Sequence, residues 1–161
     1  HQGGIVFYLD GNGGGLIAAP TDQSTGAEWG CYEANISGAD GTAIGTGAQN
    51  TIDIVNANCS PFTPGNSIAA NSCANLTLGG YSDWFLPSKD ELNLIWLNIG
   101  QGNALGLGNL GGFSFLFYWS STENGNYGLL NLAWGQDFNS GLQSSISFKG
   151  NTGYVRAVRA F

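Results

Sequence analysis

The sequence predicts an α+β fold, in which strands and loops surround one well-defined helix. Three observations support this prediction. A capped amphipathic helix follows Pro87, short apolar segments near both ends of the chain have the length of strands, and turn signals separate the segments of the last third. The chain has 161 residues without a linker or an internal repeat, so we expect one domain over residues 1–161.

The predicted helix lies in the stretch from Trp84 to Ile99. Ser88 and Glu91 match the S-x-x-E capping box, in which two side chains bond the free amide groups at the start of a helix. The apolar positions at helical spacing are Leu92, Ile95, Trp96 and Ile99, and Leu94 and Leu97 widen this stripe. We therefore expect the helix to be buried against sheet on more than one side.

Strands are expected before and after this helix. Residues 5–9 form an unbroken apolar run, which is typical of a fully buried strand, and a Gly-rich turn leads to a return strand at residues 16–19. Residues 22–43 are predicted to be a loop that Trp29 anchors to the core. Further strands are expected at residues 115–122, 132–138, 142–148 and 154–161, with a hairpin turn at residues 139–141. We expect Trp84, Trp119 and Trp134 to lie in the core, since each falls on a strand or at the helix entrance.

Two short helices are predicted between the first hairpin and the capped helix. Thr46 and Gln49 form the pattern of a second capping box for the first of them. Cys59 and Cys73 flank a loop with Pro and Gly, and we expect a disulfide between them that ties the two helices together. Cys31 would then be a buried thiol or an intermolecular partner. In the loop at residues 100–112 the leucines are expected to pin the backbone to the core.

The charge balance excludes several classes of partner. The net charge is −7, and only four residues are Lys or Arg. Nucleic acids, anionic membranes and sulfated polysaccharides need basic surfaces, so we expect none of them as a partner. No apolar run has the length of a membrane span, which argues against membrane insertion. Arg156 and Arg159 differ in parity along the last predicted strand, so at least one is expected to be buried and paired with Glu91, Glu123 or Asp83.

The sequence offers no combination of residues typical of a catalytic site. The only histidine is His1, so a Ser or Cys nucleophile has no histidine base in the body of the chain. The turns that begin at Asp10 and Asp40 contain oxygen ligands but match no EF-hand calcium loop. We therefore expect no enzymatic activity, no metal site and no cofactor.

Six phrases resemble a known family, in the same order. They are GGIVFYLD from Gly3, LIAAPTDQST from Leu16, W-x-LPSKDEL from Trp84, YWSSTE from Tyr118, AWGQDF from Ala133 and YVRAVRAF from Tyr154. Together they resemble the Lcl C-terminal domain family of bacterial collagen-like surface proteins, over nearly the whole chain. The resemblance implies a C-type-lectin-like fold, with antiparallel sheets, adjacent terminal strands and flanking helices. The same fold houses formylglycine-generating enzymes, but Cys59 and Cys73 lie in the wrong region for their reactive cysteine pair.

The resemblance implies a secreted or surface-displayed bacterial protein, with adhesion as its role and a homo-oligomer, a trimer or a fibre, as its state. The family resemblance implies sulfated ligands, but this sequence is acidic, so we do not expect it to bind them. We expect a non-catalytic binding module that recognises a neutral glycan or a protein through the loops around residues 100–112, 124–131 and 139–151. The candidate ligand-binding residues are Asn124, Asn126, Tyr127, Asn139 and Gln143. The alternative is a self-assembling structural subunit of a surface fibre or sheath, which low charge and an unpaired Cys31 would favour.

Overall fold

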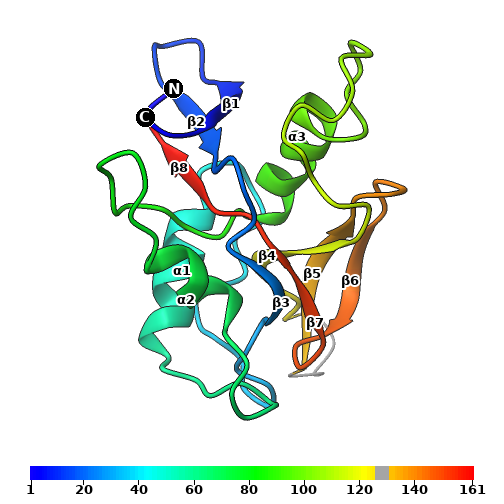
Figure 1. The fold of residues 1–161 in the computed structure, drawn as a ribbon. Coiled ribbons are helices and arrows are strands. Elements are labelled where there is room, and N and C mark those ends of the chain that lie inside the picture. Colours follow the sequence, from blue (N-terminus) through cyan, green and yellow to red (C-terminus); the bar gives the residue numbers. More distant parts are fainter. Residues whose placement is uncertain (126–130) are drawn as a thin grey trace.

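The computed structural model describes residues 1–125 and 131–161 and shows an α+β fold with two separate sheets (Figure 1). One sheet has three strands in the order β1-β2-β8, and the other has five strands in the order β3-β7-β4-β5-β6. The strands are β1 (Ile5–Leu9), β2 (Gly15–Ala18), β3 (Ser24–Glu28), β4 (Phe117–Glu123), β5 (Leu132–Asp137), β6 (Gln143–Phe148), β7 (Thr152–Val155) and β8 (Val158–Ala160). The helices are α1 (Gly47–Asn56), α2 (Ala69–Ala74) and α3 (Lys89–Ile99).

The small sheet joins the two ends of the chain. Strands β1 and β2 form the predicted antiparallel hairpin, and β8 pairs antiparallel with the other edge of β2. The first and last strands therefore flank β2 and do not pair with each other, which corrects the expected adjacency of terminal strands. The prediction that β1 is fully buried was also wrong, because it is an edge strand in which only Phe7 is buried, and Leu9 is 66% exposed.

The large sheet contains two elements that the sequence pattern did not predict. Strand β3 falls inside the predicted loop at residues 22–43; its sequence STGAE has no apolar run, and its pairing with β7 supplies the order. The predicted last strand is in fact two strands in different sheets, β7 and β8. The chain changes sheet at Arg156, whose buried guanidinium donates to the carbonyls of Ala19 and Gly111. Strand β7 also pairs in parallel with β4, at Tyr154 and Tyr118.

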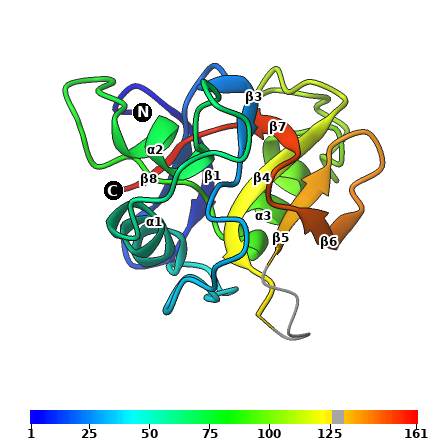
Figure 2. The ribbon, with the colours of Figure 1, turned by 90° about the horizontal axis from the view of Figure 1, so that it is seen from below.

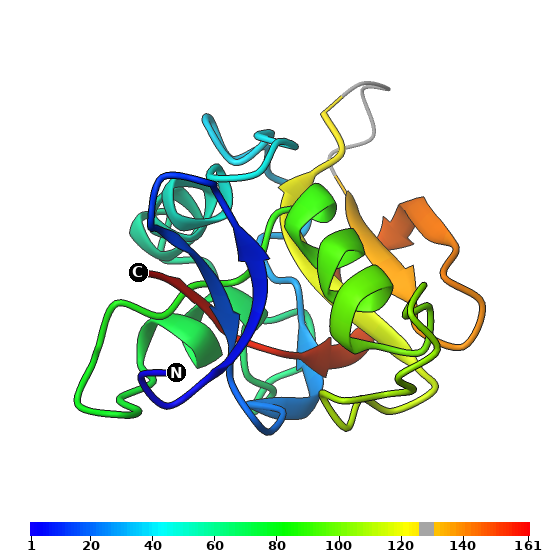
Figure 3. The same ribbon diagram turned by 90° about the horizontal axis from the view of Figure 1, so that it is seen from above.

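Helix α3 has the predicted start and the predicted surroundings. The Ser88 hydroxyl accepts from the Glu91 amide, and the Glu91 carboxylate accepts from the Ser88 amide at 2.7 Å, so the capping box is confirmed. Its buried face consists of Leu92, Ile95 and Ile99, which pack in one core cluster. The helix contacts β1, β4 and β5, so sheet covers it on more than one side (Figure 3).

Helices α1 and α2 occupy the predicted positions but lack the predicted cap and disulfide. No side chain caps α1, because the Thr46 hydroxyl donates to the Ala43 carbonyl instead. The disulfide joins Cys31 to Cys59, whereas Cys73 is a free, buried cysteine on α2. Cys73 is fully buried in the core cluster that α2 shares with β3, whereas Cys59 is only partly buried at the margin of that cluster. The observed bridge connects the segment after β3 to the segment after α1. Helices α1 and α2 lie together on the side of the molecule away from β5 and β6 (Figure 2).

The leucines of the loop at residues 100–112 do not pin it to the core. Leu105, Leu107 and Leu110 are 81%, 58% and 54% exposed. The loop is held by polar contacts at its two ends instead, where the Gly111 amide donates to Ile99 and the Gln101 side chain donates to Phe113. The predicted pinning was therefore wrong, and these leucines form part of the surface.

Candidate functional site

Strand β4 separates two environments by the alternation of its side chains. Tyr118 points to one face of the sheet and packs in the cluster that contains the buried leucine and isoleucine residues of α3. Phe117 and Trp119 point to the other face, where their rings meet edge to face with centroids 5.0 Å apart. The two faces of the same strand therefore carry different side-chain chemistry and different neighbours.

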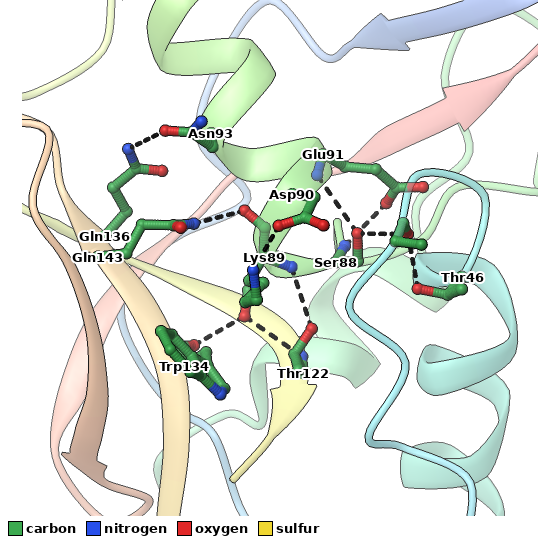
Figure 4. A network of polar contacts seen from close by, with 12 residues as sticks. Thr46, Ser88, Lys89, Asp90, Glu91, Asn93, Thr122, Trp134, Gln136 and Gln143 are labelled. Carbon is green, nitrogen blue, oxygen red and sulfur yellow. Dashed lines mark hydrogen bonds and ion pairs between the residues drawn. The ribbon is translucent and has the colours of Figure 1, made fainter.

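The face covered by α3 carries a polar network between the helix and the sheet, in which only Gln136 Oε1 is buried without a partner in the described part of the chain (Figure 4). The Lys89 amide at the start of the helix donates to the Thr122 hydroxyl at 3.0 Å, and the Gln143 amide donates to the Lys89 carbonyl at 2.6 Å. The Gln136 amide donates to Asn93 at 2.9 Å, and the Lys89 ammonium lies 5.3 Å from the centre of the Trp134 ring. Most polar side chains on this face thus serve to attach the helix to the sheet.

Helices α1 and α2 pack against part of the opposite face, around the buried Trp119, and the part that they leave uncovered forms a groove of about 370 Å³. We call it the sheet-face groove, and it is lined by Phe117, Trp119, Ser147, Asn151 and Thr152. Its volume falls in the range of small-ligand sites, which measure roughly 300–1,000 Å³. Asn151 and Thr152 are exposed, and neither side chain has a hydrogen-bond partner within residues 1–125 and 131–161. The groove therefore combines aromatic rings with free hydrogen-bonding groups.

Two glycines on the strands beside β4 make room for the aromatic rings. A Cβ atom at Gly135 of β5 would lie 2.2 Å from Cζ of Phe117. A Cβ atom at Gly153 of β7 would lie 2.8 Å from both Cδ1 and Nε1 of the Trp119 indole. The rings lie close over the neighbouring backbone because these positions have no side chain. The floor of the sheet-face groove depends on both glycines.

The turn from β6 to β7, which carries the polar rim of the groove, is anchored by a buried ion pair. The Lys149 ammonium pairs with the Glu123 carboxylate, donates to the Ala34 carbonyl at 2.7 Å, and lies 4.6 Å from the centre of the Trp29 ring. Both partners are buried, and the burial lowers the pKa of Lys149 although Glu123 acts in the opposite direction. The backbone carbonyl of Lys149 also accepts from the Trp29 amide. Asn151 therefore follows a rigid anchor point.

No charged side chain lines the sheet-face groove, and each lysine and arginine of the chain is held in an ion pair elsewhere. The pairs are Lys89–Asp90, Lys149–Glu123, Arg156–Asp22 and Arg159–Asp83. The chain has 11 Asp and Glu residues against these four cations. The groove thus presents uncharged chemistry on an acidic molecule.

Comparison with protein families gives the chain its assignment. The model of the Lcl C-terminal domain matches residues 19–159. The chain belongs to the Lcl C-terminal domain family. This match confirms the family that the six sequence phrases predicted. A comparison with curated proteins found no match.

Within this Lcl C-terminal domain, the predicted ligand-binding residues lie in three different settings. Asn124 is only 4% exposed, and its amide donates to the Ser145 carbonyl. Gln143 is part of the network under α3, and Asn139 is exposed in the hairpin turn after β5. Asn126 and Tyr127 lie outside the described residues. Of the three predicted positions that the structure describes, none lines the sheet-face groove.

The groove residues that the prediction missed had a weak signal in the sequence. Ser147 belongs to the strand whose alternating pattern predicted one wet face, and Asn151 ends the predicted loop at residues 139–151. The pattern could not show which part of the sheet would stay uncovered, because α3 covers one face and α1 and α2 cover part of the other, all from distant parts of the sequence.

The buried arginines of the domain form ion pairs, as predicted, but only one of them pairs with a predicted partner. Arg159 pairs with Asp83, which was one of the three predicted partners. Arg156 pairs with Asp22 at 2.8 Å, which was not predicted, and Glu123 serves Lys149. Trp84 and Trp119 are buried as expected, whereas Trp134 is only half-buried.

Within the described ranges, 1–125 and 131–161, no group of three or more His, Cys, Asp or Glu side chains is arranged to hold a metal ion. In the same part of the chain, no helix has both the length and the apolar character that crossing a bilayer requires.

Proposed function

We propose that this Lcl C-terminal domain is a non-catalytic binding module of a secreted or cell-surface bacterial protein, which recognises a glycan or a protein ligand through the sheet-face groove. The observation that carries the proposal is the groove itself, with an aromatic floor and free uncharged polar groups at its rim. Family membership supports a role in a surface protein. The Cys31–Cys59 disulfide agrees with an oxidising location outside the cytoplasm.

The proposed fold type is C-type-lectin-like. Both chain ends meet in one small sheet around β2, a second sheet carries the open face, and helices flank the two sheets (Figures 1 and 3). This arrangement agrees with the fold that the family resemblance implies, except that β2 lies between the terminal strands.

The hydrogen bonds and ion pairs of the buried carboxylates support the proposal of a non-catalytic role. Burial raises the pKa of Glu91, which is the direction that a general acid requires. Glu91, however, accepts hydrogen bonds from the Ser88 and Gly45 amides and is enclosed by the start of α3. Glu28 accepts hydrogen bonds from the loop at residues 61–66, and Glu123 forms an ion pair with Lys149. These three carboxylates therefore act as structural acceptors.

The test is a binding screen with a variant that fills the groove. The purified domain is applied to immobilised glycans and to surface-protein extracts, in parallel with Ser147→Trp. We expect the wild-type domain to retain a ligand and Ser147→Trp to lose it, because the indole would occupy the groove. Thr25→Trp, at an exposed position of β3, is the matched control and should bind like wild type. A wild-type domain without any glycan or protein ligand would contradict the proposal.

The second candidate function is a self-assembling structural subunit. Strand β6 is an edge of the large sheet, and Leu142 and Ile146 on or beside it are 69% and 71% exposed. An exposed apolar edge strand is a template for pairing with another copy. Light scattering over a concentration series should then show wild-type assemblies that Ile146→Lys abolishes. A wild-type domain that stays monomeric at high concentration would exclude this candidate.

A further inference from the structure

The sheet-face groove has the features of a site for a ring with both apolar and hydroxylated surfaces. Trp119 supports the Phe117 ring edge to face, and the Gly135 backbone lies directly against it. Such a ring is held in one orientation at no further entropic cost on binding. Aromatic residues with a few placed polar groups are the usual composition of small-ligand sites.

The polar groups at the rim are free to bond a ligand. The Ser147 hydroxyl has one weak partner, Ser144, at 3.3 Å. The side-chain amide of Asn151 and the hydroxyl of Thr152 have no partner in the described part of the chain. These groups supply donors and acceptors of hydrogen bonds without carrying charge. They differ in this respect from Gln143 and Gln136 on the other face, whose amides are bound to the α3 region and the adjacent turn.

The charge distribution selects against an anionic ligand. A sulfated or carboxylated sugar would approach a domain of net charge −7. The four lysines and arginines are already paired with Asp or Glu, and none of them lines the groove. An anionic group would thus lose hydration without gaining a counter-charge.

We infer that the sheet-face groove binds one uncharged pyranose ring of a neutral glycan, which stacks on Phe117 and bonds to Ser147, Asn151 and Thr152. This inference rests on the proposed binding function and specifies its ligand class. It makes the open face of the large sheet, and not the hairpin tips, the part of the domain that determines specificity.

The experiment uses an array that contains neutral oligosaccharides of glucose, galactose, mannose and N-acetylglucosamine, together with sulfated and sialylated ones. We expect the wild-type domain to bind at least one neutral glycan and to prefer it to the anionic glycans. Asn151→Ala and Thr152→Val should each weaken that binding about fivefold to tenfold, since each removes one hydrogen bond. Thr25→Val is the control, an exposed threonine on the neighbouring strand β3, and should change affinity less than about twofold.

Phe117→Leu tests the stacking contact, because it keeps an apolar side chain over Gly135 but removes the aromatic face. We expect it to weaken binding more than the two rim variants do. If circular dichroism shows that Phe117→Leu does not fold, the exposed rim variants decide, since neither side chain contributes to the core.

Three results would overturn the inference. Neutral glycans could bind equally well to the wild type and both rim variants, anionic glycans could bind better than neutral ones, or the domain could retain a protein ligand while binding no glycan. The first result would place binding at another site and would also overturn the groove as the site of the proposed function. The other two would leave the proposed function standing with another class of ligand. Absence of any glycan or protein ligand would overturn the inference and the proposed function together.

Discussion

The two faces of the five-stranded sheet differ in what their polar side chains do. On the face under α3, Gln143 and Gln136 bond to the helix or its neighbouring turn, and Lys89 is paired with Asp90 and lies near Trp134 (Figure 4). On the uncovered part of the other face, the side chains of Asn151 and Thr152 have no such partners among residues 1–125 and 131–161. Side chains of the same chemical types are thus structural on one face and available on the other.

This difference shows that residue type alone does not identify a binding site. Amides and aromatic residues occur on both faces, and a sequence pattern weights them equally. The distinction arises from the packing of a helix that is distant in the sequence. Substitutions in the elements that support the groove should therefore differ in effect according to how deeply each replaced side chain is buried.

The largest effect is expected from the buried ion pair under the β6–β7 turn. Lys149→Met should lower the free energy of unfolding by about 3–5 kcal/mol, because it leaves the Glu123 carboxylate buried without its cation. Lys89→Met removes a cation from a partly exposed pair and should cost about 1 kcal/mol or less. Urea denaturation of both variants measures the two losses in the free energy of unfolding. Equal losses in the free energy of unfolding for the two variants would show that the buried Lys149–Glu123 pair stabilises the fold no more than the partly exposed Lys89–Asp90 pair.

The disulfide is expected to have the next effect. Cys31→Ala with Cys59→Ala should lower the free energy of unfolding by about 3.5 kcal/mol, because the bridge closes a loop with a sequence separation of 28. Peptide mapping without reduction should recover Cys31 linked to Cys59. Cys73 should resist alkylation in the folded protein, since burial raises its pKa and excludes the reagent. Recovery of a Cys59–Cys73 peptide would contradict the structure.

A smaller effect is expected from the groove floor. Gly135→Ala should lower the free energy of unfolding by about 1–3 kcal/mol, because the added methyl group would overlap the Phe117 ring. Gly26→Ala is the control, since a Cβ atom there would meet nothing within 4 Å. Thermal unfolding of both variants gives the measurement. A Gly135→Ala protein as stable as Gly26→Ala would mean that the ring does not lie over the strand.

The smallest effect concerns the loop at residues 61–66 and its response to acid. Burial alone would raise the pKa of Glu28, but hydrogen bonds from Asn66, Thr63 and Phe62 outweigh it and hold the pKa below its ordinary value. The resulting stabilisation is present above the pKa of the unfolded chain and is lost as the pH falls through the folded value.

Glu28→Gln should accordingly reduce the decline in stability between about pH 6 and about pH 3. Denaturation midpoints across this pH range provide the measurement, and Asp40→Asn, at an exposed turn position, is the control. An unchanged acid slope in Glu28→Gln would indicate that this carboxylate does not stabilise the loop.

The parts of the fold that the sequence predicted correctly depend on local interactions. Ser88 and Glu91 are three residues apart, and their reciprocal hydrogen bonds need no distant partner. The hairpin turn at residues 139–141 is likewise local, with the Gly141 amide donating to the Asp137 carbonyl. The helix, strand and turn signals together also predicted the broad α+β architecture.

The errors occurred where a distant partner decides the outcome. Strand β3 forms because β7 lies beside it, although its own sequence has little strand character. Cys59 pairs with Cys31 because the segment after β3 returns to the end of α1, whereas Cys73 faces the core. The open groove has the same origin, since its position depends on which face α3 covers.

The most direct test of the central claim is a map of backbone amide chemical shifts during titration with the neutral oligosaccharide selected on the array. We predict that the amides of Phe117, Ser147, Asn151 and Thr152 shift together, while those of Lys89 and Gln143 under α3 remain in place. Shifts confined to the loop at residues 100–112 or to the turn at residues 139–141 would contradict the account.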